Sequence, residues 1–116
     1  MANVTIWHNP RCSKSRNAVT LLEEKGIEAE VVKYLDTPPS REELVAVLKM
    51  LGISARELMR TKEDIYKELN LKEERDEDKL IDAMVENPKL IERPVVIKDG
   101  KAAIGRPIEN IIDLLD

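Results

Sequence analysis

The sequence predicts an α/β protein with a mixed four-stranded sheet, built in the order βαβ, a helical insert, then ββα. Two observations carry this prediction. Short β-branched runs alternate with helical apolar patterns, and a two-residue turn signal joins the last two strands. The chain has 116 residues, of which 42% are hydrophobic, enough to form one core. We therefore expect a single domain over residues 1–116 with a helical insert at about 40–87.

The first expected strand covers residues 4–8, where apolar and polar side chains alternate until Asn9-Pro10 interrupts the pattern. A helical pattern follows over 13–25, and Gly26 ends it as a C-terminal cap would. A valine-containing run over 29–35 gives the second strand. A helix between two strands makes the strands parallel, with a right-handed crossover.

The expected insert begins after Asp36-Thr37-Pro38-Pro39, which breaks the chain. Two helix starts then carry a serine with a glutamate three residues later, Ser40 with Glu43 and Ser54 with Glu57. A further helix is expected over 77–86, ended by Asn87-Pro88. The charged runs in this insert indicate a solvated face, or a docking surface for a partner.

The last third of the chain predicts a hairpin and a final helix. Val95-Val96-Ile97 is a strand, Asp99-Gly100 is a strong two-residue hairpin turn, and Ala102-Ala103-Ile104 is the returning strand. Pro107 suits the first position of the helix that follows.

The charge and composition of the chain argue against several classes of protein. With 19 Lys and Arg against 23 Asp and Glu, the net charge is −4, which disfavours a general nucleic-acid binder. No apolar run approaches the roughly 20 residues that span a bilayer, and the N-terminal residues do not resemble a signal peptide. The single Cys forms no internal disulfide and nucleates no cysteine metal site. We expect a cytoplasmic protein without a metal, a membrane or a nucleic-acid partner.

Cys12 is the candidate nucleophile. It lies between the first strand and the first helix, at the sheet edge where α/β proteins bind ligands. The helix N-terminus and the cations Arg11, Lys14 and Arg16 favour the thiolate over the thiol, and they attract an oxyanion. His8 is placed four residues before Cys12 and could hold a proton near the sulfur, although a structural role for it stays open.

The spacing around Cys12 excludes two thiol chemistries. A phosphatase-type loop needs an arginine about six positions after the cysteine, so that the backbone between them wraps the anion, but that position is Ala18. A dithiol oxidoreductase needs a second cysteine within about three residues, and Ser15 stands there. Any disulfide of this protein must therefore include a thiol from another molecule.

The whole chain resembles the glutaredoxin-coupled arsenate reductases, in a short subgroup that ends after the last helix, within the thioredoxin-like fold. The matching motifs are His8-Asn9-Pro10 with Cys12 and Ser15-Arg16, Tyr34-Leu35, Pro38-Pro39-Ser40-Arg41, Gly52-Ile53-Ser54, Met59-Arg60, Asn87-Pro88, Arg93-Pro94-Val95-Val96 and Gly105-Arg106-Pro107.

The resemblance implies a role for each matching residue. Cys12 matches the nucleophile that attacks arsenate, and His8 matches the residue that promotes ionisation of that cysteine. Arg60, Arg93 and Arg106 match arginines that hold the oxyanion, a task that suits their fixed, charged donors. The resemblance also implies supporting roles for Ser15 and Arg16, a cis peptide bond before Pro94, glutathione as co-substrate, glutaredoxin as partner and no tightly bound cofactor.

Two other functions stay open at this point. A monothiol glutathione-dependent reductase of mixed disulfides would use Cys12 but not Arg60, Arg93 and Arg106. A redox-responsive regulator that binds RNA polymerase belongs to the same superfamily, but such regulators carry a second cysteine where Ser15 stands here.

Overall fold

The computed structural model describes residues 4–105 and 108–115. Its internal contacts divide the chain into two compact units. The sheet unit comprises Met1–Thr37 with Arg93–Asp116, and the helical unit comprises Pro38–Glu92.

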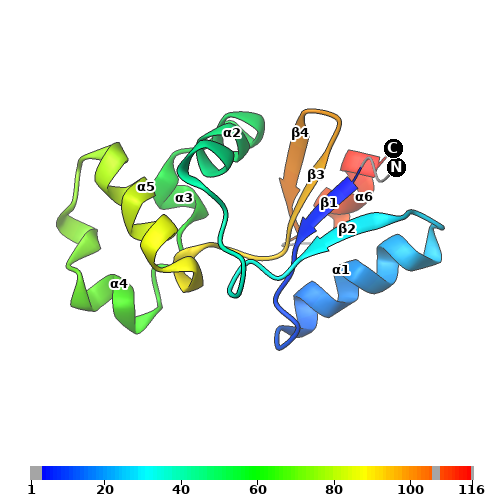
Figure 1. Cartoon of the computed structure of the whole chain (residues 1–116), viewed down its shortest axis with the longest axis horizontal. Helices are drawn as coiled ribbons and strands as arrows, with labels where there is room; N and C mark the ends of the chain where they lie inside the picture. Colours follow the sequence, from blue (N-terminus) through cyan, green and yellow to red (C-terminus); the bar gives the residue numbers. More distant parts are fainter. Residues whose placement is uncertain (1–3, 106–107, 116) are drawn as a thin grey trace. The chain divides into compact units, whose positions relative to one another are not determined.

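The sheet unit contains four strands in the order β2-β1-β3-β4 (Figure 1). β1 (Val4–Trp7) pairs in parallel with β2 (Ala29–Val32) and antiparallel with β3 (Val95–Lys98), which in turn pairs antiparallel with β4 (Lys101–Ile104). The helix α1 (Ser13–Glu24) connects β1 to β2, and α6 (Glu109–Leu115) follows β4. The mixed four-stranded sheet and its βαβ and ββα halves are confirmed.

One apolar cluster joins α1 and α6 to the same face of the sheet. Its fully buried members come from β1, α1, β3 and α6, namely Val4, Ile6, Ala18, Leu22, Val96 and Ile111. Ile6 pairs directly with Val96 across β1 and β3. Because alternate side chains of a strand point to one face, Val4 and Ile6 both reach the two helices. This packing holds α1 against β1, β3 and α6 through Ala18 and Leu22.

The second strand is shorter than the sequence predicts. β2 ends at Val32, whereas the β-branched and apolar run extends to Leu35. The carbonyl oxygen of Lys33 accepts hydrogen bonds from the backbone N–H groups of Asp36 and Thr37, both at 2.9 Å. This turn takes the chain out of the sheet, so the apolar residues after Val32 do not extend the ladder.

The β3–β4 hairpin turns at Asp99-Gly100, as predicted. Both residues have positive φ, 48° for Asp99 and 78° for Gly100, which matches the twist of a two-residue hairpin. The peptide bond between Arg93 and Pro94 is cis, which confirms the expectation from the resemblance. Pro107, expected at the first position of the last helix, lies outside the described residues.

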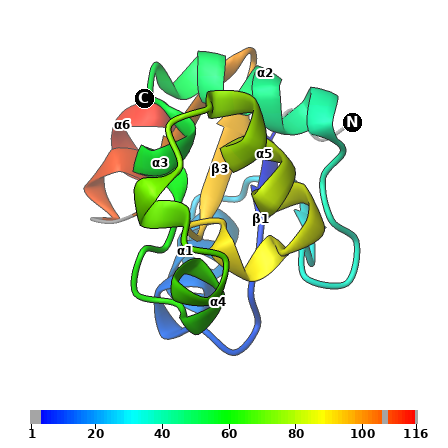
Figure 2. The ribbon, with the colours of Figure 1, turned by 90° about the vertical axis from the view of Figure 1, so that its left-hand side faces the viewer.

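The helical unit consists of short helices (Figure 2). These are α2 (Arg41–Leu51), α3 (Ala55–Leu58), α4 (Asp64–Glu68), η1 (Leu71–Glu73), α5 (Glu77–Glu86) and η2 (Pro88–Leu90). The expected capping box is present at α2, where Ser40 and Glu43 exchange hydrogen bonds of 3.1 Å. The helix predicted over 77–86 is confirmed.

Arg56 holds the middle of the helical unit together. Its guanidinium donates to the Tyr66 hydroxyl at 2.5 Å, to the Leu71 carbonyl at 3.0 Å and to the Glu74 carbonyl. One side chain thereby ties α3 to α4 and to the segment after it. Within the described ranges, no helix has both the length and the apolar character needed to cross a membrane.

Candidate active site

Cys12 is the N-cap residue of α1 and is buried, with 9% of its surface exposed. Its backbone N–H donates to the carbonyl of Asn9 at 3.0 Å, and its carbonyl accepts from the N–H of Arg16 at 3.0 Å. The thiol side chain therefore lies at the junction between the turn after β1 and the first turn of α1. The N–H dipoles of a first helical turn favour negative charge at that place.

The turn between β1 and α1 is fixed by side chains on both sides of Cys12. The Asn9 side-chain oxygen accepts from the N–H of Arg11 at 3.0 Å, and the Arg16 guanidinium donates to the Pro10 carbonyl at 3.0 Å. Arg11, Lys14 and Arg16 are exposed. Arg16 therefore has a structural contact in addition to its charge, and it keeps that charge close to the turn that carries the sulfur.

His8 and Ser15 form a buried polar pair beneath this turn. The Nδ1 atom of His8 lies 2.7 Å from the Ser15 hydroxyl oxygen, which also accepts from the Asn9 N–H at 3.0 Å. His8 is 9% exposed and Ser15 is fully buried. The backbone N–H of His8 donates to the Val32 carbonyl at 2.8 Å, so the end of β2 holds it as well.

The pKa of His8 is lowered from its usual value of 6.5, first by desolvation on burial and then by the positive charges of Lys33 and Arg16. The imidazole is therefore neutral at pH 7. The lowered pKa disfavours a permanent positive charge on His8 at that pH.

Pro94 and Gly105 pack together beside the start of β3. The N–H of Gly105 donates to the Pro94 carbonyl at 2.9 Å. A Cβ atom built on Gly105 would lie 2.8 Å from Pro94 Cγ and 2.6 Å from Ile111 Cδ1, closer than ordinary contact allows. A glycine at position 105 therefore lets the segment after β4 approach the cis-proline.

The three expected oxyanion-binding arginines fall in different places. Arg93 belongs to the sheet unit, directly before the cis-proline, and its Nε and Nη1 atoms are buried. Arg106 comes after β4 in the sequence and lies outside the described residues. Arg60 belongs to the helical unit, in the segment after α3.

Arg60 is held by two carboxylates of its own unit. Its Nη1 atom pairs with Glu63, and its Nε atom lies 3.8 Å from a carboxylate oxygen of Glu92. Its backbone N–H donates to the Leu90 carbonyl at 2.7 Å. About 29% of the side chain is exposed, and the guanidinium is oriented by these two carboxylates.

Three charged residues that were not predicted as site residues belong to these arrangements, namely Glu63, Glu92 and Lys33. Glu63 lies three residues after Arg60, in the turn that precedes α4, and this closeness in sequence is the signal that could have marked it. Glu92 and Lys33 each interact with a residue that is distant in sequence. Glu92 pairs with Arg60, and the charge of Lys33 lowers the pKa of His8. No local pattern marks such long-range partners. Within residues 4–105 and 108–115, no group of three or more metal-ligating side chains gathers to hold a metal ion.

Comparisons with known proteins agree with this architecture. A family model, the ArsC family, matches residues 7–114. An arsenate reductase of Neisseria meningitidis serogroup A is 58% identical over 113 residues, covering 96% of this chain and 97% of that protein. An arsenate reductase of Escherichia coli is 44% identical over 116 residues, covering 99% of this chain and 82% of that protein.

A solved structure of an arsenate reductase from Vibrio cholerae superposes with a TM-score of 0.92 at 50% identity, covering 97% of this chain and 98% of that one. The sheet order described above is accordingly that of a thioredoxin-like protein. The family model covers most of the chain, and a relative shares more than half of its residues with it. This chain therefore belongs to the ArsC family.

Proposed function

We propose that this protein is an arsenate reductase in which Cys12 is the nucleophile. The observation that carries the proposal is the position of the chain's only thiol, at the N-cap of α1 and among the exposed cations Arg11, Lys14 and Arg16. Such a place favours both a thiolate and a bound oxyanion. Membership of the ArsC family and the arsenate-reducing activity named for its relatives support the substrate.

In the first step, the Cys12 thiolate attacks the arsenic atom of dihydrogen arsenate. An S–As bond forms, an As–O bond breaks, and one proton is taken up as the oxygen leaves as water. The product is a covalent cysteine–arsenate adduct in which arsenic is still As(V). The proton comes from the solvent, and we propose that the His8 imidazole relays it toward the departing oxygen by accepting one proton and releasing another.

In the second step, glutathione attacks the Cys12 sulfur of the adduct. An S–S bond forms and the S–As bond breaks, and its electron pair stays on arsenic, which becomes As(III). The glutathione proton goes to the released arsenite. Since the chain has one cysteine, the mixed disulfide must be reduced by a thiol of another molecule, and we propose that this molecule is glutaredoxin. Reduced thiols are the rule in the cytoplasm, which is where we place the reaction.

Arg60, Arg93 and Arg106 are proposed to bind the oxyanion. Arsenate is a tetrahedral anion with several acceptor oxygens, and guanidinium groups offer paired, permanently charged donors. Ser15, Arg16 and Pro94 are proposed as supporting residues. Ser15 orients His8, Arg16 anchors the turn that carries Cys12, and Pro94 shapes the start of β3.

The test is arsenate-dependent oxidation of NADPH by the pure protein with glutathione, glutaredoxin and glutathione reductase. We expect turnover by the native protein and none above background by the Cys12→Ser variant. Equal rates for the two proteins would overturn the assignment.

A second assay separates arsenate reduction from reduction of protein mixed disulfides. Arg60→Ala, Arg93→Ala and Arg106→Ala are each expected to raise the arsenate KM while leaving the rate with a glutathionylated peptide unchanged, because the peptide presents no tetrahedral anion. Retention of both activities in all three variants would favour the monothiol reductase instead.

A further inference from the structure

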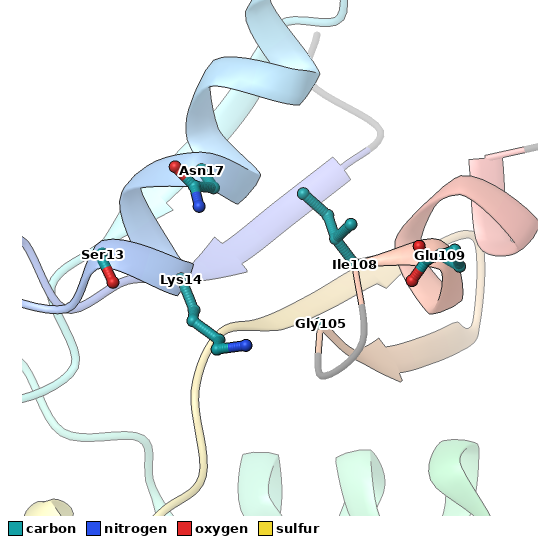
Figure 3. Close-up of a pocket in the computed structure, with 6 residues that line it drawn as sticks. All are labelled: Ser13, Lys14, Asn17, Gly105, Ile108 and Glu109. Atoms are coloured by element: carbon teal, nitrogen blue, oxygen red, sulfur yellow. The ribbon is translucent and has the colours of Figure 1, made fainter.

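A pocket of about 350 Å³ lies in the sheet unit, and its lining includes Ser13, the residue that follows Cys12 in the sequence (Figure 3). Ser13, Lys14 and Asn17 of α1 line one side, and Gly105, Ile108 and Glu109 line the other. A volume of this order falls within the range of roughly 300–1,000 Å³ found for small-molecule sites. The pocket is therefore large enough for a ligand of tripeptide size.

The pocket begins at the residue after the nucleophile. Ser13 and Lys14 follow Cys12 in the first turn of α1, and Asn17 lies one turn further along the same helix. The opposite wall is held by the contact between Gly105 and Pro94. One wall begins at the residue after Cys12 and the other at the glycine that contacts the cis-proline, so a ligand here would be held next to the segment that carries the nucleophile.

The lining residues carry two opposite charges and two neutral polar groups. Lys14 supplies an ammonium group from α1, and Glu109 supplies a carboxylate from the first turn of α6. Over the described ranges, no ion pair joins either of them to another described residue. Ser13 and Asn17 add a hydroxyl and an amide. This lining complements a molecule that carries both a carboxylate and an ammonium group.

We propose that this pocket binds the thiol co-substrate, and that the co-substrate is a small zwitterionic peptide thiol. Lys14 binds a carboxylate and Glu109 binds the α-ammonium group, which leaves the thiol in the middle of the peptide free to reach Cys12. The inference rests on the proposed function, in which glutathione attacks the Cys12–arsenic adduct. It deepens that function by assigning a site to the second substrate and a role to Lys14.

Two single variants test the pocket because their electrostatic effects on Cys12 have opposite signs. Lys14→Gln removes a positive charge near the sulfur, whereas Glu109→Gln removes a negative one. A purely electrostatic effect on the thiolate would change the rate in opposite directions. Binding of a zwitterion predicts that both variants raise the KM for glutathione, each by about threefold for a partly exposed charge contact.

The assay measures initial rates against glutathione concentration at saturating arsenate, and repeats them with 2-mercaptoethanol, which carries no charge. The KM for 2-mercaptoethanol is expected to stay the same in Glu109→Gln. Lys25→Gln, which removes an exposed charge at the far end of α1, is the matched control and should leave both KM values unchanged. A glutathione KM that falls or stays constant in Glu109→Gln would overturn the proposal, as would an equal rise with both thiols.

A binding experiment keeps this proposal separate from the arsenate assignment. S-Methylglutathione, which cannot react, is titrated into the ¹⁵N-labelled Cys12→Ser protein. Saturable amide shifts at Lys14, Asn17, Gly105 and Glu109 support the site even if arsenate is not reduced. Shifts confined to other residues, or no shifts at millimolar ligand, would overturn it even if arsenate is reduced.

Discussion

The Ser15 hydroxyl oxygen lies 2.7 Å from Nδ1 of His8, with both side chains buried beneath the turn that carries Cys12. The same oxygen accepts the backbone N–H of Asn9 at 3.0 Å. The Ser15 hydroxyl is therefore the hydrogen-bond partner of both the His8 imidazole and the Asn9 backbone N–H. Removing it leaves two buried polar groups without that partner, which is costlier than losing a single hydrogen bond.

Ser15→Ala is expected to lower the free energy of unfolding by about 1–3 kcal/mol, because the His8 ring and the Asn9 N–H lose their shared partner. Urea unfolding measures the change. Ser13→Ala, at an exposed position two residues earlier, is the control and should change stability by less than about 0.5 kcal/mol. Equal losses in the two variants would contradict the role given to the buried hydroxyl.

His8 should make stability depend on pH on the acid side of neutrality. Its folded-state pKa is lowered below the usual 6.5, so on acidification the unfolded chain binds a proton before the folded chain does. The free energy of unfolding therefore rises with pH through this window and falls as pH drops below 6.5. The chain has one histidine, so no second imidazole contributes.

The measurement compares urea unfolding of the native protein and of His8→Gln at pH 7.5 and pH 5.5. We expect a smaller pH difference for the variant. An NMR titration of the His8 ring protons should give a midpoint below 6.5. A midpoint above that value would contradict the lowered pKa of His8.

Gly105→Ala is expected to destabilise the sheet unit by about 1–3 kcal/mol, because the new methyl group would meet Pro94 and Ile111 at less than 3 Å. Chemical denaturation measures the loss. Ile111→Val removes Cδ1, which is the nearer of the two atoms, and should reduce the cost of Gly105→Ala when the two changes are combined. Strict additivity would show that the clash is not with that side chain.

Glu63→Gln is expected to lower the KM for arsenate by about two- to threefold if Arg60 binds the oxyanion, because the carboxylate that pairs with the guanidinium is removed. The effect should shrink at high salt, since the pair is partly exposed. Asp64→Asn, one residue further on and exposed, serves as the control. A higher KM in Glu63→Gln would instead mean that this carboxylate is needed to orient Arg60.

The elements that the sequence predicts well are those set by neighbouring residues. The Asp99-Gly100 turn, the Ser40–Glu43 capping box and the helix stopped by Asn87-Pro88 each rest on contacts within a few positions. The end of β2 was not predictable in the same way. Apolar residues continue to Leu35, and only the backbone hydrogen bonds that return to Lys33 end the strand at Val32.

The site residues also differ in whether neighbouring or distant residues determine their contacts. A cysteine at a helix start among cations is a local pattern, and the structure places Cys12 at that N-cap. The pairing of Arg60 with Glu92 and the influence of Lys33 on His8 join residues that are distant in sequence. Such contacts depend on how strands and helices pack, and periodicity carries no information about them.

β2 and β4 are the edge strands of the sheet. Each of them pairs with a neighbouring strand on one side only. Each is only four residues long and carries a charged residue, Glu30 on β2 and Lys101 on β4, exposed to solvent. Short, charged borders hinder strand addition by another molecule, which would otherwise extend the ladder indefinitely. These two edges therefore disfavour edge-to-edge pairing between the sheets of two molecules.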